Sequence, residues 1–564
     1  MEILFLYIRL LFGWSILFTS LVGWGSIGSI FIKKFSKNDI DTIWSKLWIG
    51  FVLLIFLMQI THLFLPISKV LSLLIVFIGI VMFCVKLANT KIVKYTISRI
   101  KKNYLFLLSS TVLIILISNQ TFSENLLYDF GLYYQQTIKW LQSSELILGL
   151  ANIHGRFGYN NSSFLLVSVY DHLNIIPQSF RIVSSGMLVF SVIYTGYKLW
   201  SLVWKRENTS YNIYWSLVFV FLIPFVFYKK GVYLVSSSPD TFVVLLQFVI
   251  IGIFIEIIEN KGRFLDKFIL LLLLSGGLFS IKLSAAVFVL FSLIVGIYFL
   301  FRSHNLVPLL KEKRFWLVGL FVAFCVLVWV FRGVLLTGFP LYPFPKLGFN
   351  TEWSVGIDQA TSESNWIKSW ARMPHRTPVE VLSNNAWLRV WIKEKLEFLN
   401  FVFPLFFGLI LSLFTLVSSK LKNKFLPLLI IPISSLVFWF VTAPDIRFAF
   451  SVIWTFFILS VLVSIEVYKQ KDYSIFIIFF IAIVFTVISG SGFQYVRTSE
   501  IRNNLMDKSP ETNCVFVDQQ IEICEPKEGD RCWNSESICV PHLINNIEIV
   551  KDGNGKIKKM LKAN

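Results

Sequence analysis

The residues best able to do chemistry gather in one polar stretch, residues 119–163, of a chain that is otherwise mostly apolar. Within it, Asp129 stands shortly before Tyr133 and Tyr134 in the string YDFGLYYQQTIKW. A carboxylate at the start of a short helix can act as a general base on an acceptor hydroxyl. It can equally cap that helix, because Asp is favoured at helix N-termini. We therefore take Asp129 as the candidate catalytic residue, and the two tyrosines, whose rings can stack on a sugar, as candidate binding residues.

A glycine-rich string, GLANIHGRFGYNN, follows and carries His154, Arg156, Asn160 and Asn161. An arginine can hold a phosphate through two parallel hydrogen bonds, and glycine allows the backbone to approach a ligand closely. We therefore assign these four polar residues as candidate substrate-binding residues. The alternative is an ordinary glycine-rich turn with exposed polar groups.

Further charged side chains stand at the ends of apolar runs, where ionisable groups are costly and usually functional or paired. Asp240 closes the string VSSSPD, Lys282 separates two apolar runs, and Arg332 lies near the end of another. Lys282 and Arg332 could neutralise a lipid-linked phosphate, or could instead snorkel to the membrane interface. All three are candidate binding residues. In the string TAPDIRF, Asp445 and Arg447 are expected to form an ion pair.

The elements that must position these residues are membrane helices. Hydrophobic residues make up 56% of the chain and mean hydropathy is +0.70, whereas globular proteins are about 45–50% apolar. Apolar runs longer than about 18 residues recur, which is enough to cross a hydrocarbon core of about 30 Å. The net charge of +19 is explained by Lys and Arg in short inner loops, so we do not expect nucleic-acid binding. The sequence predicts an all-α, multi-pass membrane protein.

We predict about fourteen spans within a transmembrane domain that covers residues 1–490. They lie near residues 5–31, 46–65, 69–88, 104–119, 179–203, 211–228, 240–259, 267–281, 284–301, 315–336, 401–418, 426–443, 447–467 and 474–490. Alternation and basic loops place two long loops, residues 120–177 and 337–400, on the outer side, together with the N-terminus and the tail, residues 491–564. The string SSFLLVSVYDHLNIIP inside the first loop is interpreted as a re-entrant or surface-lying helix.

The second long loop is rich in tryptophan. Aromatic faces stack on sugars, but tryptophan also anchors helices at the membrane interface, and we favour anchoring for most of these residues. They are Trp353, Trp366, Trp370, Trp387 and Trp391.

Four of the six cysteines crowd the tail: Cys514, Cys524, Cys532 and Cys539. No Cys-x-x-Cys pair occurs among them, so zinc is not expected, and we assign no metal ligands. A divalent ion stays open as a cofactor. An even number of cysteines in a non-cytosolic segment predicts disulfides, with three connectivities open and the Cys532–Cys539 pair favoured.

Together, these features resemble the GT-C class of membrane glycosyltransferases, which have many spans, an acidic residue in the first large outer loop and a second, aromatic-rich outer loop. The resemblance implies that Asp129 is the acidic residue, although here its loop follows about the fourth span instead of the first, and no second acid stands beside it. The strings YDFGLYYQQTIKW, GLANIHGRFGYNNSSF, TAPDIRF and GDRCWNSESICVPH are similar to those of a bacterial family of multi-spanning membrane proteins.

The leading hypothesis is a glycosyltransferase that moves a sugar from a polyprenyl-phosphate-linked donor to an extracytoplasmic acceptor glycan or lipid. Asp129 would be the base, and a basic residue of the outer loops or span ends would hold the donor phosphate. Such a donor needs no nucleotide, which agrees with a sequence that has no Walker-type or Rossmann glycine motif. The alternatives are a polysaccharide polymerase or ligase, and a transporter or flippase of lipid-linked glycans. The expected location is the bacterial cytoplasmic membrane, with membrane lipids, the donor and the acceptor as partners.

Overall fold

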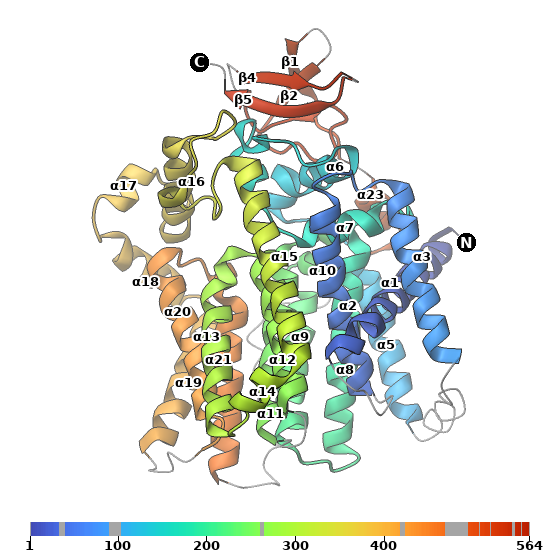
Figure 1. The fold of residues 1–564 in the computed structure, drawn as a ribbon, viewed down its shortest axis with the longest axis vertical. Coiled ribbons are helices and arrows are strands. Elements are labelled where there is room, and N and C mark those ends of the chain that lie inside the picture. The colour runs from blue at the N-terminus through green and yellow to red at the C-terminus, as the bar shows by residue number, and fades with distance from the viewer. Residues whose placement is uncertain are drawn as a thin grey trace.

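The protein consists of a large helical bundle and a small β-rich tail that lies at one end of it (Figure 1). The structure, a computed structural model, describes residues 2–32, 40–88, 103–259, 264–417, 423–468, 494–506, 508–518, 521–543, 547–553 and 555–562.

Twelve of the described helices are long and apolar enough to cross a membrane. They are α1 (Glu2–Ile32), α2 (Ile40–Thr61), α3 (Lys69–Ala88), α5 (Tyr104–Thr121), α8 (Arg181–Val203), α9 (Ser210–Phe227), α11 (Pro239–Glu259), α12 (Phe264–Ile281), α13 (Ala286–Arg302), α15 (Lys313–Thr337), α19 (Leu399–Val417) and α21 (Ile446–Tyr468). A shorter apolar helix, α20 (Ile430–Thr442), follows the 3-10 turn η7 (Leu426–Leu429). These thirteen helices match the first thirteen spans predicted from the sequence, which confirms a multi-pass helical protein. The fourteenth, residues 474–490, lies outside the described residues.

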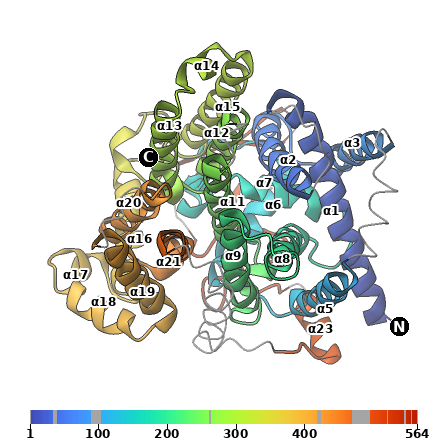
Figure 2. The ribbon, with the colours of Figure 1, turned by 90° about the horizontal axis from the view of Figure 1, so that it is seen from below.

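Burial separates the middle of the bundle from its rim. In α11, 89% of the most apolar window is buried, against 22% in α3, and the view from below shows α11 inside and α3 at the edge (Figure 2). The backbones of helices α1 and α2 are in contact at Gly50. A Cβ at this position would lie only 1.9 Å from the Leu21 carbonyl oxygen. Small residues allow such close approach where lipid provides no hydrophobic drive to pack helices.

Short helices cover the end of the bundle that carries the tail, here called the tail end. The first long loop (residues 122–180) forms the π-helical turn η1 (Phe130–Tyr134), α6 (Gln135–Ser143), the 3-10 turns η2 (Leu150–Asn152) and η3 (Gly155–Gly158), and α7 (Ser163–Asp171). The second long loop (residues 338–398) forms η6 (Pro345–Leu347), α16 (Ile357–Arg372), α17 (Pro378–Leu382) and α18 (Trp387–Leu396). Three further short elements belong to neither loop: η5 (Leu283–Ala285), α10 (Val232–Val235) and α14 (Leu306–Lys311). Of these, α14 lies at the end of the bundle opposite the tail (Figure 1).

One expectation for these loops becomes more definite, and another needs correction. The segment predicted to be a re-entrant or surface-lying helix forms the short helix α7, which protein covers from Ser163 to Tyr170. Of the loop tryptophans, Trp387 and Trp391 are also buried, because they pack with Trp439 of α20 in a separate apolar cluster. The prediction of interfacial anchoring therefore fails for these two.

The tail contains strands that the sequence analysis does not predict. After α23 (Thr498–Leu505), strands β1 (Thr512–Asp518), β2 (Ile521–Pro526) and β3 (Ile538–Cys539) form one sheet, and β4 (Ile547–Lys551) pairs with β5 (Ile557–Lys562) in a hairpin. Cys514 lies opposite Cys524 in the antiparallel β1–β2 register. Two disulfides, Cys514–Cys524 and Cys532–Cys539, confirm the predicted pairing of the four tail cysteines.

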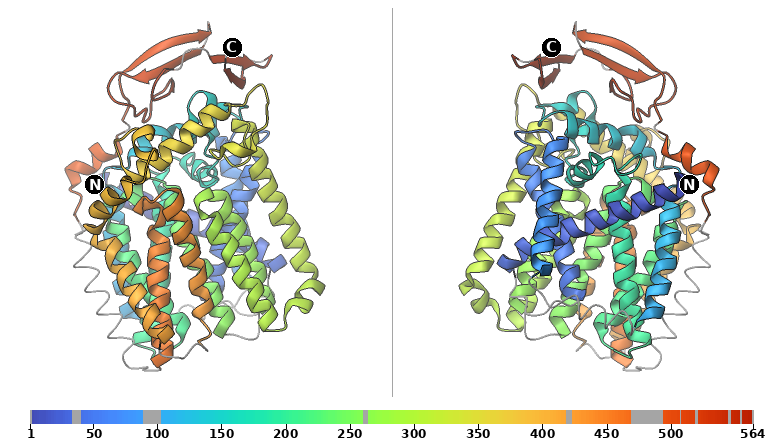
Figure 3. Two further views of the ribbon diagram at one scale, coloured as in Figure 1. Left: turned by 90° about the vertical axis from the view of Figure 1, so that its left-hand side faces the viewer. Right: turned by 90° about the vertical axis from the view of Figure 1, so that its right-hand side faces the viewer.

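Both long loops, the tail and the N-terminal helix meet at the tail end (Figure 3). The amide of Asn152 in the first loop donates to the Met560 carbonyl of β5 at 2.9 Å, and Lys559 pairs with Glu352 of the second loop. Glu2, at the start of α1, pairs with Arg502 of α23. The structure thus brings together the parts that the predicted topology places on one side of the membrane.

Candidate substrate cleft and buried charge cluster

A partly open cleft lies at the tail end, and the empty space in and around its mouth, open solvent included, is about 540 Å³. The first long loop provides most of its wall, and the ends of α2 and α15 complete it. Its lining includes five of the predicted site residues: Tyr133, Arg156, Asn160, Asn161 and Arg332. It also includes Leu, Ile, Phe and Trp side chains from residues 140–165, and Glu145, which pairs with Lys558. The lining therefore combines apolar side chains with two arginines, the combination needed to hold an amphiphile with an anionic head.

Arg332 is the charged group deepest in this wall. Arg332 is 3% exposed. Its guanidinium donates hydrogen bonds to three neutral acceptors. These are the side-chain oxygen of Asn160 at 3.3 Å, the carbonyl of Gln59 at 3.4 Å and Nδ1 of His62 at 3.1 Å. Among the described residues, no carboxylate lies within ion-pair distance of Arg332. A buried cation with only neutral partners is costly, and an anion in the cleft would relieve that cost.

The contact with Arg332 also fixes the state of His62. An arginine can only donate, so Nδ1 of His62 must accept and its proton must sit on Nε2. His62 is therefore a neutral imidazole here, and the charge at this point of the cleft belongs to Arg332 alone. The sequence analysis misses His62, although an ionisable residue directly after the apolar run of α2 is a readable signal.

Arg156, the second cation of the cleft, is held from behind by Asp129. One carboxylate oxygen of Asp129 pairs with Arg156 at 3.0 Å, and the other pairs with Arg447 at 2.7 Å. Asp129 itself does not line the cleft and is 8% exposed. Burial by itself would raise the pKa of Asp129, but the charges of Arg447 and Arg156 outweigh it and hold the pKa below its usual value.

The local backbone explains how Asp129 reaches both arginines. It directly precedes the π-helical turn η1, and its side chain makes no capping hydrogen bond. The capping alternative considered from the sequence is therefore wrong. Turns of π-helix are rare and are frequently found at functional sites. This one places the Tyr133 ring in the cleft wall, where the Arg156 guanidinium lies 5.6 Å from the ring centroid.

Arg447 is the partner that sequence reasoning assigns wrongly. The expected ion pair with Asp445 is absent, because the Asp445 carboxylate accepts the backbone N–H of Arg447 at 2.8 Å. The Arg447 guanidinium instead crosses to Asp129, which is distant in the sequence.

The second long loop contributes Glu363, which the sequence analysis also misses. Its carboxylate accepts the hydroxyl of Tyr159 and lies 3.9 Å from Nε of Arg156. Tyr159 lines the cleft, so this acid is connected to the cleft through one phenol. Burial and then the charge of Glu363 raise the pKa of Tyr159 well above its usual value, so the phenol is neutral at physiological pH.

The remaining predicted site residues lie beside or behind the cleft. Asp240 and Lys282 pair with each other, and the Lys282 ammonium lies 4.7 Å from the centroid of the Phe448 ring. Tyr134 is buried against Phe164, outside the cleft wall. His154 is also outside it, and burial, reinforced by Arg156 and His542, lowers the pKa of His154 to about 3. Five of the predicted residues therefore line the cleft, and these four do not.

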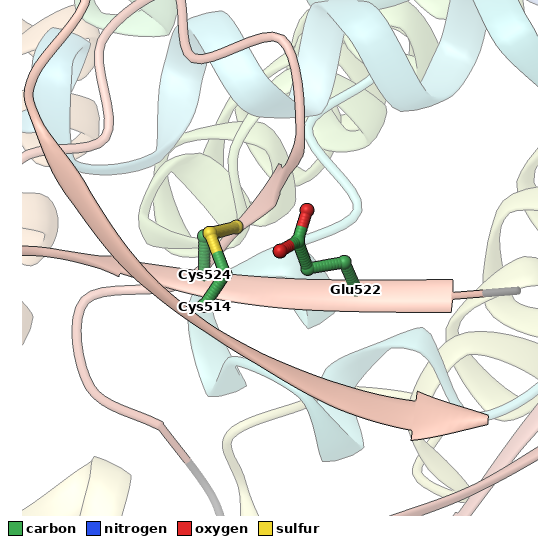
Figure 4. A group of neighbouring side chains, drawn as sticks. All are labelled: Cys514, Glu522 and Cys524. Carbon is green, nitrogen blue, oxygen red and sulfur yellow. A yellow bond between two sulfur atoms is a disulfide. The ribbon is translucent and has the colours of Figure 1, made fainter. Parts of the chain in front are cut away.

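The single grouping of three metal-ligating side chains that the described residues provide lies in the tail, at Cys514, Glu522 and Cys524 (Figure 4). The two cysteines form a disulfide, as the close view shows, so neither offers a thiolate. This grouping does not fit a metal ion. At the cleft, the charge of Asp129 is already balanced by two guanidiniums.

A bundle of membrane-length helices defines a multi-pass membrane protein, and the cleft that contains Arg156 and Arg332 is its candidate binding site. The chain belongs to the family described as "Domain of unknown function (DUF8201)", whose model matches residues 8–454. The match includes Asp129, Arg156, Arg332 and Arg447, and it stops before the tail. No curated protein and no solved structure matches the chain.

Proposed function

We propose that the protein is a GT-C-like membrane glycosyltransferase that moves a sugar from a polyprenyl-phosphate-linked donor to an extracytoplasmic glycan or lipid acceptor. The observation that carries this proposal is Arg332, a buried guanidinium with neutral partners in the lining of a cleft that also contains many apolar side chains. A phosphate would supply the missing negative charge through charge-assisted hydrogen bonds. The prenyl chain attached to it would lie against the apolar side chains of the lining.

The bacterial cytoplasmic membrane is the proposed location, with the tail end on the extracytoplasmic side. Basic residues at the opposite end of the bundle support this orientation, among them Arg302, Lys311 and Lys313 around α14 (Figure 1). Positively charged loops are retained on the cytoplasmic side. The N-terminus and the disulfide-bonded tail would then both be outside, where disulfides persist.

Two groups compete for the role of acceptor base. Asp129 as the base stays a prediction, but its carboxylate would have to leave at least one guanidinium to accept a proton. The Tyr159–Glu363 pair offers another route, because Tyr159 reaches the cleft and Glu363 accepts its hydroxyl hydrogen. An acceptor hydroxyl could pass its proton to Tyr159 while Tyr159 passes its own to Glu363.

The deciding experiment compares binding of a polyprenyl monophosphate with binding of the matching polyprenol to the full-length protein in lipid nanodiscs. We expect the phosphate to bind and the alcohol to bind at least about tenfold more weakly, since a hydrogen bond to a charged group contributes about 1.5–3 kcal/mol. Arg332→Gln should remove this preference. Arg314→Gln is the matched control, because it removes a cation from the other end of the same helix, where Arg314 pairs with Asp266.

Equal binding of phosphate and alcohol would refute the anion site. If the phosphate binds, transfer of a radiolabelled sugar from a lipid-linked donor tests the reaction itself. Movement of the intact lipid-linked glycan across the bilayer, without transfer, would identify a flippase instead. Transfer of a preassembled glycan would identify a polymerase or ligase.

A further inference from the structure

A loop of the tail lies directly against the turn that carries Asp129. The backbone N–H of Trp533 donates to the Gly131 carbonyl at 2.8 Å, and the side-chain amide of Gln136 donates back to the Trp533 carbonyl at 2.9 Å. Lys139 adds a hydrogen bond to the Ser535 carbonyl at 2.5 Å. These contacts join residues almost 400 positions apart along the chain and include both η1 and α6.

The Trp533 ring fills the space that a side chain at Gly131 would occupy. A Cβ on Gly131 would lie 2.7 Å from Cε2 and 2.8 Å from Cδ2 of the ring, closer than real contacts allow. Gly131 lies in the π-helical turn two residues after Asp129 and two before Tyr133. The ring therefore packs on the backbone that connects the charge cluster to the cleft wall.

The tail holds this ring in place from its own side. Trp533 follows Cys532, whose disulfide with Cys539 closes the loop, and both sulfurs are buried. Two cations flank the indole: the Lys508 ammonium lies 4.8 Å and the Arg531 guanidinium 5.1 Å from the ring centroid. Cations at such distances are attracted to an indole face. The ring is thus fixed by covalent, polar and electrostatic contacts that belong to the tail.

We propose that Trp533 is a positioning residue, which sets the π-helical turn so that Asp129 holds Arg156 at the wall of the cleft. The tail is then part of the site, although it does not line the cleft. The inference rests on the proposed function only for its ligand-binding readout. Its structural claim, that Trp533 orders residues 129–140, can be measured without any ligand.

The test uses full-length protein in nanodiscs and hydrogen–deuterium exchange of the peptides that cover residues 129–140. Trp533→Ala should increase exchange there about tenfold, because the backbone of the turn loses the indole ring that covers Gly131. The folded fraction should bind polyprenyl monophosphate about tenfold more weakly, since the part of the cleft lining formed by Tyr133 and Arg156 is no longer fixed beside Arg332. Trp533→Phe, which keeps an aromatic ring, should restore most of both properties.

Phe516→Ala is the matched control, because Phe516 is an exposed aromatic residue of β1 in the same tail. It should change neither property. A second test does not depend on the stability of Trp533→Ala. Gly131→Ala alone should disturb the turn through its clash with the ring, and Gly131→Ala combined with Trp533→Leu should relieve that clash.

The outcomes separate this inference from the proposed function. The positioning role would be overturned if exchange in Trp533→Ala stays at the parental rate. It would also be overturned if the increases in exchange caused by Gly131→Ala and Trp533→Leu simply add in the double variant. If exchange responds as expected but the parental protein binds no polyprenyl monophosphate, the positioning role stands and the proposed function fails. If the turn stays ordered in Trp533→Ala and the variant binds the phosphate like the parent, the positioning role is wrong and the proposed function is unaffected.

Discussion

Arg156 and Arg332 line the same cleft, but their charges are balanced in opposite ways. Arg156 has acids on both sides, Asp129 at 3.0 Å and Glu363 at 3.9 Å, and Asp129 is shared with Arg447. Arg332 has an amide oxygen, a backbone carbonyl and a neutral imidazole. The charge of Arg156 is therefore balanced within the protein, whereas no described carboxylate balances the charge of Arg332.

This difference separates support from binding within one site. An ion pair within the fold contributes to the structure, because removing one partner leaves the other charge buried and unpaired. A charge with neutral partners contributes little to folding and is available to a ligand. Arg332 should therefore control affinity, while Asp129 should control the integrity of the cluster.

The largest effect is expected for Asp129→Asn. The change leaves the guanidiniums of Arg156 and Arg447 without their shared carboxylate, and breaking a buried ion pair in this way costs about 3–5 kcal/mol. We expect a clear loss of stability, measured as a lower apparent melting temperature in detergent.

Adding Arg447→Gln to Asp129→Asn should recover part of that loss, because the double variant removes one cation along with the anion. An Asp129→Asn protein that melts like the parent and only transfers sugar about 10²–10⁴-fold more slowly would reverse our contrast and make Asp129 the base.

Arg332→Gln should behave in the opposite manner. Gln keeps donors for Asn160 and the Gln59 carbonyl but removes the buried charge, so the melting temperature should not fall. Affinity for a polyprenyl monophosphate should drop roughly 10- to 100-fold, measured by titration in nanodiscs. Lost stability with unchanged affinity would show that Arg332 is a structural cation instead.

Much of this site follows from sequence because its parts are local or obey a strong solvent rule. Arg156, Asn160 and Asn161 stand within six positions of each other in the first long loop, so any fold that orders the loop brings them together. Arg332 is identifiable because an ionisable group at the end of an apolar run is costly in a membrane. The spans follow from length and hydropathy for the same reason, since a bilayer leaves few ways to satisfy the backbone.

The pairings do not follow from sequence, because they depend on how distant helices pack. Proximity suggests that Arg447 pairs with Asp445, but the Asp445 carboxylate satisfies a backbone N–H and the guanidinium pairs with Asp129. Glu363 meets Arg156 only because the two long loops converge. The strands of the tail are a different case, because IEIVKDGNGKIKKML has two β-prone runs around a Gly- and Asp-rich turn. Such a pattern is typical of a β-hairpin, so the β4–β5 pair is predictable from local sequence.

The smallest effect concerns His154, which lies within the electric field of Arg156. Burial and then the Arg156 charge lower the pKa of His154 to about 3, whereas an unfolded histidine has a pKa of about 6.5. The unfolded state therefore gains a proton first, and stability that is fully present above about pH 6.5 is lost as the pH falls toward 3. Between about pH 7 and about pH 5, protonation of this one group in the unfolded state should lower the free energy of unfolding of the parent by about 1–2 kcal/mol.

His154→Asn removes the titration, so its apparent melting temperature in detergent should fall less than the parental value over that interval. Asp129 does not confuse the comparison, because its pKa is depressed and it stays ionised throughout that range. Parallel losses in parent and variant would mean that His154 takes up its proton normally in the folded protein, so that neither burial nor the Arg156 charge lowers its pKa.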